Sequence, residues 1–431
     1  MSGSVNGLTG GNAAADDATT YWAQLLHFYQ PPWQSHEVLR KILDECYRPL
    51  VALLLDHPHA RLAVNMNAVL TEMLLDHGAD DVVTGLRMLA EREQIEFVGS
   101  GKYHPILPLI PEGLRRRSIQ ENAQTNAQHF GPAAWRPRGF FPPEMAFDES
   151  LPAIVGETGH DWTIVSGVAC PGDWPMERVD SVAAGSGDLA VLFRDDVRSN
   201  RISFRETTAE QFVGDLTDWS PAGGGPAYVV TAMDAETYGH QLPGWEREFL
   251  APTYEILSSR NFAGRTVKMV KPSDLLTLFP AGGRVRPLAS SWSTSADEIG
   301  GGDPFPLWKS PNNEVHALQW RLVDVVIALT ETALRLAGDE ESRRYADLAD
   351  RALQPALQSC QFWWASRRPM WEPILVYRGL ALLEETSFHA SRAIWKSAPN
   401  ASQSAEANRL MAESADLRHQ LEAALFGEEA H

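Results

Sequence analysis

Short apolar runs alternate with helix-like stretches over roughly 260 residues of this 431-residue chain. A short run precedes Glu144, and the other strand-like runs lie at 21–26, 61–66, 95–98, 162–165, 189–193, 227–232 and 266–270. Helical patterns fall near 67–77, 80–93, 112–130, 147–158, 207–216, 245–259 and 272–279. Such alternation is typical of an α/β fold with parallel strands. With seven or eight strands, we predict an irregular seven-stranded (β/α) barrel rather than an open sheet.

The pattern changes after about residue 280, where glycine-rich loops lead into almost continuous helical periodicity. Helical patterns are expected near 313–337, 340–366, 370–393 and 402–426. We therefore predict a catalytic barrel over 21–290 and a C-terminal α-helical bundle subdomain over 291–431. Residues 1–20 are small and polar, and we expect them to form a disordered tail.

The composition limits the classes of partner that the protein is expected to bind. The formal net charge of −19 argues against nucleic acid and against an anionic membrane surface. No apolar run reaches transmembrane length, and the first residues do not have the pattern of a signal peptide. Cys46, Cys170 and Cys360 are far apart in the sequence and are expected to be reduced thiols. We thus expect a cytoplasmic protein with no membrane partner; its oligomeric state is left open.

The most unusual single residue is Glu144, which follows the run Phe141-Pro142-Pro143. Two prolines end the strand and fix the direction in which the chain enters Glu144. A carboxylate among bulky apolar neighbours is usually paired or catalytic. The alternative is an ordinary acid at the start of a helix, stabilised there by the helix dipole.

A second carboxylate, Asp234, directly follows the apolar run 227–232. The carboxyl ends of parallel strands lie on the same side, so Glu144 and Asp234 are expected to meet there. A pair of carboxylates at that position suits glycoside hydrolysis, in which one attacks the anomeric carbon and the other acts as acid and then base.

Other polar or aromatic residues near strand or helix ends are candidates for substrate binding. Each has a plainer alternative: a capping histidine, a turn glutamine, a surface ion pair or simple packing. Glu96 alternates with apolar neighbours and would face the lumen of a closed barrel. Two adjacent tryptophans on one helix cannot both face the same side, so one is expected to pack and the other could reach a sugar. The candidates are His27, Gln30, Glu96, His104, Arg194, Glu236, His240, Trp363 and Trp364.

Five short blocks in this order resemble those of glycoside hydrolase family 57. The first, His-x-His-Gln-Pro, is similar to 27–31, with Tyr29 in place of the second histidine. The second resembles 94–99 and 103–107, with His104 where glutamate is common. The third and fourth match Phe141 to Glu144 and Asp234 to Gly239, and the fifth loosely matches 360–364. The resemblance implies a seven-stranded β/α barrel with a helical C-terminal subdomain.

The resemblance also implies a retaining enzyme that acts on α-glucans, as a hydrolase or a transglycosylase, with Glu144 as the nucleophile and Asp234 as the acid/base. The expected partner is an α-linked oligo- or polysaccharide, and neither a cofactor nor a metal is expected. Retention predicts that the two carboxyl groups are about 5–5.5 Å apart, against about 6.5–9.5 Å for inversion.

Two alternatives remain open. One is a metal-dependent enzyme on a related barrel, such as a polysaccharide deacetylase or an α-mannosidase, which could use His27, Asp234 and His240 as ligands. The other is a catalytically silent glycan-binding protein that keeps the cleft but not the turnover.

Overall fold

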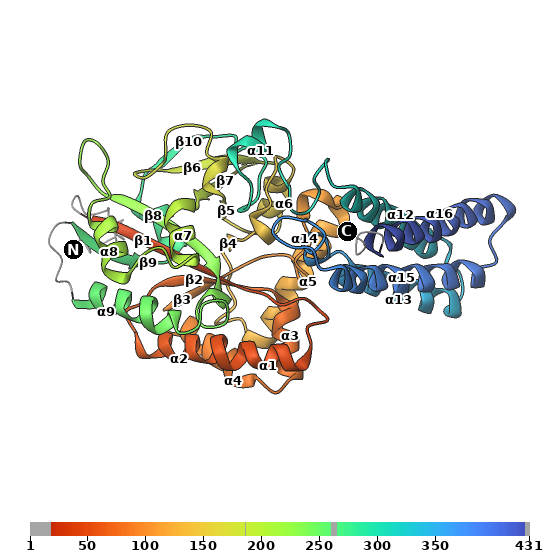
Figure 1. Ribbon diagram of the computed structural model, residues 1–431, viewed down its shortest axis with the longest axis horizontal. Helices are drawn as coiled ribbons and strands as arrows, with labels where there is room; N and C mark the ends of the chain where they lie inside the picture. The colour runs from red at the N-terminus through yellow and green to blue at the C-terminus, as the bar shows by residue number, and fades with distance from the viewer. Residues whose placement is uncertain (1–18, 186, 260–264, 427–431) are drawn as a thin grey trace, which may run out of the picture.

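The computed structural model describes residues 19–185, 187–259 and 265–426 (Figure 1). Its first sheet has the order β3-β2-β1-β8, and β9 also pairs with β1. All its pairs are parallel. Every residue of β1 is buried, since helices and a second sheet cover its two faces. The strands are β1 Thr19–Phe28, β2 Leu62–Met66, β3 Ile95–Val98, β8 Ala227–Asp234 and β9 Thr266–Val270.

The second sheet has the order β10-β6-β7-β5-β4. Its β4–β5, β5–β7 and β10–β6 pairs are parallel, whereas β6 and β7 form an antiparallel hairpin. The sequence pattern did not predict β6, in which Asp180 and Ser181 interrupt the apolar run, or β10, which is short and contains two glycines. The strands are β4 Gly139–Phe140, β5 Trp162–Val165, β6 Val179–Ala184, β7 Gly187–Phe193 and β10 Ala281–Arg284.

Backbone hydrogen bonds join the two sheets at both sides. The Gly99 N–H donates to the Gly139 carbonyl at 2.8 Å, and the Phe141 N–H donates to the Gly99 carbonyl at 2.8 Å. On the other side, the Asp195 N–H donates to the Val230 carbonyl at 2.7 Å. An apolar cluster fills the space between the sheets, with contributions from Leu25, Val98, Phe141, Ile164 and Val230 among others. The predicted parallel α/β architecture is confirmed; the closed seven-stranded barrel remains a prediction.

Helices cover the outer faces of the sheets and bury a second apolar cluster against β1, β2, β3 and β8 (Figure 1). A π-helical segment, Leu43–Tyr47, joins α1 to α2, and another, Glu246–Leu250, precedes α9. These helices are α1 His36–Ile42, α2 Arg48–Asp56, α3 Ala68–Asp76, α4 Asp80–Glu91, α5 Glu112–Phe130, α6 Leu151–Glu157, α7 Asp196–Ser203, α8 Ala209–Thr217, α9 Ala251–Ser259 and α10 Pro272–Leu278.

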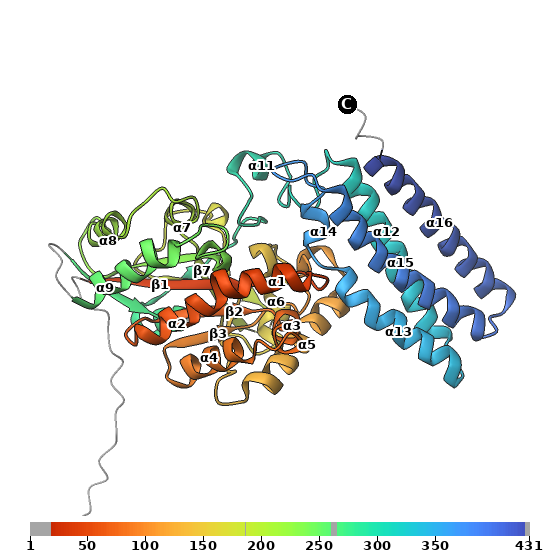
Figure 2. The same cartoon turned by 60° about the horizontal axis from the view of Figure 1, so that its bottom comes forward.

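The C-terminal region is helical, as predicted, and its four long helices extend together away from the strands (Figures 1 and 2). They are α12 Glu314–Leu336, α13 Glu340–Ala356, α15 Pro373–Lys396 and α16 Ala401–Phe426; α11 Ala296–Gly300 and α14 Cys360–Trp363 are short. None of the helices in the described part of the chain has the length and hydrophobicity needed to cross a bilayer.

Three expected elements differ from the observed ones. The stretch 340–366 is not one helix, because the chain leaves α13 after Ala356 so that Gln358 can form a β-bridge with Pro105. The helix expected at 147–158 begins only at Leu151, since Phe147 forms a bridge with Ser290. Of the tail expected over 1–20, residues 1–18 lie outside the described residues, whereas Thr19 and Thr20 belong to β1.

Candidate active site

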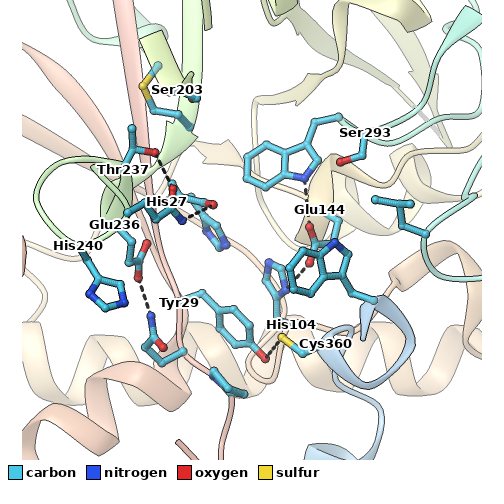
Figure 3. Close-up of a pocket in the computed structure, with 18 of the residues that line it drawn as sticks. His27, Tyr29, His104, Glu144, Ser203, Glu236, Thr237, His240, Ser293 and Cys360 are labelled. Atoms are coloured by element: carbon cyan, nitrogen blue, oxygen red, sulfur yellow. Dashed lines mark hydrogen bonds and ion pairs between the residues drawn. The ribbon is translucent and has the colours of Figure 1, made fainter. Parts of the chain in front are cut away.

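A cavity of about 740 Å³ opens at the carboxyl ends of β1 and β8 (Figure 3). Segments from both sheets and from the C-terminal region line it, so residues more than 300 positions apart share one site. The sequence-predicted residues that it brings together are His27, Gln30, His104, Glu144, Arg194, Asp234, Glu236, His240 and Trp363.

Glu144 sits in a tight turn immediately after the two prolines. Its backbone is in the left-handed region, with φ 58° and ψ 17°, and Met145 follows with φ 48°. Non-glycine residues rarely adopt this conformation, and such strain clusters at functional sites. The turn directs the Glu144 side chain into the cavity, where it is 15% exposed.

Two donors hold the Glu144 carboxylate. The Ser359 hydroxyl donates to Oε1 at 2.9 Å, and the Trp292 indole N–H donates to Oε2 at 3.1 Å. The His104 Nδ1 lies 3.5 Å from Oε1. Burial and the nearby Asp234 charge raise the pKa of Glu144 to about 8, and the two hydrogen bonds oppose that rise.

Asp234 is the last residue of β8 and is in register with His27 on β1. It is partly exposed, and the Gln241 amide donates to its Oδ2 at 3.4 Å. Its charge acts on Glu144 and also on Glu236. The Asp234 charge therefore acts on both of the other carboxyl groups in the cavity, Glu144 and Glu236.

Glu236 is buried and accepts two hydrogen bonds at Oε1. The Gln30 amide donates to it at 2.9 Å, and the Tyr47 hydroxyl donates to the same oxygen. Burial and then the Asp234 charge raise the pKa of Glu236. This network holds Gln30 and Glu236 together in the lining of the cavity.

Stacked rings form another wall of the cavity, to which His27, Tyr29 and His104 contribute. His27 stacks on Phe141 and on His104 with ring centroids 4.8 Å apart in both pairs, and His104 stacks on Tyr29 at 4.1 Å. His27 Nδ1 lies 2.6 Å from the Asn65 Oδ1. Burial lowers the pKa of His27 despite the opposing effect of Asp234, so this wall carries neutral rings at pH 7.

Two sequence-predicted residues lie outside the cavity lining. Glu96 accepts the Ser273 N–H at 2.8 Å and thus caps α10, and burial raises its pKa. Trp364 is buried and contacts Trp33 with ring centroids 5.8 Å apart. Because neighbouring positions on a helix point in different directions, only Trp363 of the tryptophan pair lines the cavity.

Arg194 and His240 line the cavity but are engaged with protein groups. The Arg194 guanidinium donates to the Ala232 carbonyl at 2.8 Å, to Asp196 at 2.7 Å and to Asn200 at 2.9 Å. It therefore ties the end of β7 to β8. His240 Nδ1 pairs with the Glu45 carboxylate at 2.8 Å.

Sequence reasoning did not identify Trp292, Ser359 or Asn65. Trp292 and Ser359 lie 148 and 215 positions from Glu144; Trp292 is in a loop, and Ser359 falls within the stretch 340–366 that was expected to be one helix. Asn65 did carry a signal, since it is an amide within the otherwise apolar strand β2. Buried amides of this kind usually hydrogen-bond a functional or structural partner.

The metal-dependent alternative requires a ligand cluster. Within residues 19–185, 187–259 and 265–426, no group of three or more His, Cys, Asp or Glu side chains is arranged to hold a metal ion. His27, Asp234 and His240 line the same cavity but do not form such a group.

The chain is thus an α/β protein in which parallel strands bring several carboxyl groups to one cavity. Aromatic side chains line that cavity, and a helical C-terminal region lies beside it. Within that class, the chain belongs to glycosyl hydrolase family 57, whose family model matches residues 20–287.

Individual relatives match more weakly. A segment of 145 residues is 27% identical to alpha-amylase 1 of Dictyoglomus thermophilum, covering 34% of this chain and 21% of the amylase. Over 343 residues the chain is 23% identical to a probable 1,4-alpha-glucan branching enzyme of Mycobacterium tuberculosis, covering 67% and 61% of the two chains. The first curated relatives are thus matched over about a fifth of their length.

Solved structures share the fold. A branching enzyme of the same family from Thermococcus kodakaraensis superposes with a TM-score of 0.65 at 15% identity, over 92% of this chain and 95% of the other. The amylase AmyC of Thermotoga maritima gives 0.65 at 14% identity, over 94% and 97%. Both the sheets and the helical C-terminal region are therefore features of the family fold.

Proposed function

We propose that this protein is a retaining glycoside hydrolase or transglycosylase that acts on α-glucans through a glycosyl-enzyme on Glu144, with Asp234 as acid and base. One observation carries the proposal: Glu144 and Asp234 line the same cavity, and the Asp234 charge acts on the Glu144 carboxyl. The α-glucan substrate is suggested by the related amylases, glucanotransferases and branching enzymes.

The reaction has two displacements. Glu144 attacks the anomeric carbon, the glycosidic bond breaks, and the leaving oxygen takes its electron pair and the proton of Asp234. Asp234 then removes a proton from water or from a sugar hydroxyl, which attacks the same carbon and releases Glu144. Retention requires the two carboxyl groups to act from positions about 5–5.5 Å apart.

The two carboxyl groups share one proton in the reactive state. Glu144 must be ionised to attack, although burial and the Asp234 charge raise its pKa to about 8. Asp234 must be protonated to act as the acid, and its proton removes the charge that opposes ionisation of Glu144. The hydrogen bonds from Ser359 and Trp292 favour the same state, because they stabilise the Glu144 carboxylate.

The cavity walls suit a neutral sugar. The half-buried Trp292 and Trp363 offer apolar faces on which pyranose rings can stack. Sugar hydroxyls would be bound by His27, Gln30, Glu236 and His240. His104 and Arg194 would instead shape the cavity through their contacts with Ser359 and Asp196. Glu96 and Trp364 would act from outside the cavity, through α10 and through packing.

We assign catalysis to residues 21–290 in an irregular ring of β1, β2, β3, β4, β5, β7 and β8, with 291–431 as the helical subdomain. The Gly99–Phe140 bridge, just after β3, and the hydrogen bond from the Asp195 N–H to the Val230 carbonyl support the ring.

The test is turnover of a panel of maltooligosaccharides, amylose, glycogen and α-galactosides, with product anomers followed by NMR. We expect α-configured first products from an α-glucan and loss of turnover by at least about 10³-fold in Glu144→Gln and Asp234→Asn, with folding intact. β-Configured first products, or full activity in Glu144→Gln, would overturn the assignment.

A further inference from the structure

We propose that His104 and Ser359 are positioning residues for Glu144, acting as a two-step hydrogen-bond chain through which the C-terminal region orients the attacking carboxylate. The inference rests on the proposed function, because it concerns the nucleophile of that reaction.

Side-chain and backbone contacts both form the chain. His104 Nδ1 lies 2.9 Å from the Ser359 Oγ, and that hydroxyl donates to Glu144 Oε1 at 2.9 Å. The Ser359 N–H donates to the His104 carbonyl at 3.0 Å, and Pro105 forms a bridge with Gln358. Ser359 and His104 are fully buried, so their geometry is fixed by packing as well as by hydrogen bonds. Figure 3 shows His104 beside Glu144.

The positions of the protons determine which group donates at each step of this hydrogen-bond chain. Burial and the neighbouring His27 hold the pKa of His104 well below its usual range, so the ring is neutral and has one N–H. Its Nε2 is buried without a partner among the described residues. A proton on Nδ1 is therefore favoured, since a buried, unpaired N–H on Nε2 would cost free energy. Nδ1–H then donates to Ser359, whose hydroxyl hydrogen must point to Glu144.

The effect of the Ser359 hydrogen bond on the Glu144 carboxyl depends on the charges of the other groups that face Glu144. They are Asp234 at the end of β8, His104 after β3, Tyr29 after β1 and Cys360 in α14. Burial keeps the two last groups neutral, raising the pKa of Cys360 to about 12 and that of Tyr29 further above its usual value. With His104 neutral, only Asp234 contributes a charge, and Ser359 opposes its effect.

The experiment compares Ser359→Ala, Ser359→Thr and His104→Gln with the wild-type protein, using α-maltosyl fluoride. Fluoride leaves without acid assistance, so this substrate reports on attack by Glu144 rather than on Asp234. We expect Ser359→Ala to lower kcat about 10–100-fold with KM within about twofold, and to move the acid limb of the kcat/KM profile to higher pH. Ser359→Thr keeps the hydroxyl and should recover most of kcat, while His104→Gln should give an intermediate loss.

The matched control is Ser414→Ala, a buried serine of α16 outside the cavity, which should leave kcat and the pH profile unchanged. Circular dichroism and thermal unfolding establish that each variant folds. An active wild-type protein with an unshifted profile in both Ser359→Ala and His104→Gln would overturn the inference. A wild-type protein that turns over neither α-maltosyl fluoride nor any α-glucan would instead overturn the proposed function.

Discussion

Trp292 is joined to Glu144 twice. Its indole N–H donates to the Glu144 Oε2 at 3.1 Å, and its backbone N–H donates to the Glu144 carbonyl at 3.2 Å. Two residues earlier, Ser290 forms a β-bridge with Phe147. The loop that carries Trp292 thus fixes both the strained backbone and the carboxylate of the same residue.

Replacing Trp292 with Phe should keep the backbone contact and remove the indole donor. We expect kcat to fall about 10–100-fold, because a hydrogen bond to a charged group contributes about 1.5–3 kcal/mol. The acid limb of the pH–rate profile should also move to higher pH. Trp395→Phe, at an exposed position of α15, is the control. An unchanged profile in Trp292→Phe would show that the indole does not stabilise the carboxylate.

Glu144→Gln should stabilise the fold at alkaline pH. Burial raises the pKa of Glu144 from 4.5 to about 8, so the native state keeps a proton that the unfolded chain releases in that interval. Stability from this group is present below about pH 4.5 and is lost as the pH rises to about 8. The variant should therefore match the wild-type protein near pH 4.5 and exceed it by a few kcal/mol at pH 9.

Urea unfolding at pH 4.5, 7 and 9 measures this difference, with the exposed Glu149→Gln as the control. A gain in stability that is equal at all three pH values would contradict the raised pKa.

Asn65 should control the hydrogen-bonding state of His27. With Nδ1–H donated to Asn65, the other nitrogen of the neutral ring is an acceptor for a sugar hydroxyl. Asn65→Ala frees the ring, and we expect KM for maltoheptaose to rise about 10-fold with a smaller change in kcat. Asn65→Asp should raise the pKa of His27, visible by NMR titration of the imidazole. Identical titrations in all three proteins would argue against this contact in solution.

Gly239→Ala should disrupt the loop between Glu236 and His240. Gly239 has φ +117°, and an added Cβ would lie 1.9 Å from the Glu45 carbonyl oxygen, which is backbone and cannot move aside. We expect a loss of a few kcal/mol in stability together with reduced turnover. Gly113→Ala in α5, where a Cβ meets nothing within 4 Å, should instead be neutral or stabilising by about 0.5–1 kcal/mol. Thermal unfolding of the two variants tests the contrast.

The sequence predicted those parts of the fold and cavity that depend on local pattern. Continuous apolar runs gave β1, β5 and β8, and the parallel direction of the strands brought Glu144 and Asp234 to one cavity. The alternation along β3 also predicted that the Glu96 side chain points to the opposite face of the strand from Ile95 and Phe97. The alternation could not predict that Glu96 contacts the start of α10 rather than the cavity, since this depends on the position of each residue along the axis of the assembled sheets.

Contacts between distant loops could not be predicted in this way. Trp292 and Ser359 reach Glu144 only because the Phe147–Ser290 and Pro105–Gln358 bridges fold their loops against it. Such bridges depend on the assembled sheets, not on residue periodicity. The same reason explains why helix 340–366 was predicted as continuous.

The position of β1 also sets an order of events during synthesis. This strand pairs with β2, β8 and β9, and its Trp22 indole donates to Thr231, 209 positions later. While the ribosome extends the chain, β1 can pair with β2 long before its other partners exist. One edge of this fully buried strand therefore stays unpaired while the chain grows by the 209 positions that separate Trp22 from Thr231, and chaperones can bind it during that interval.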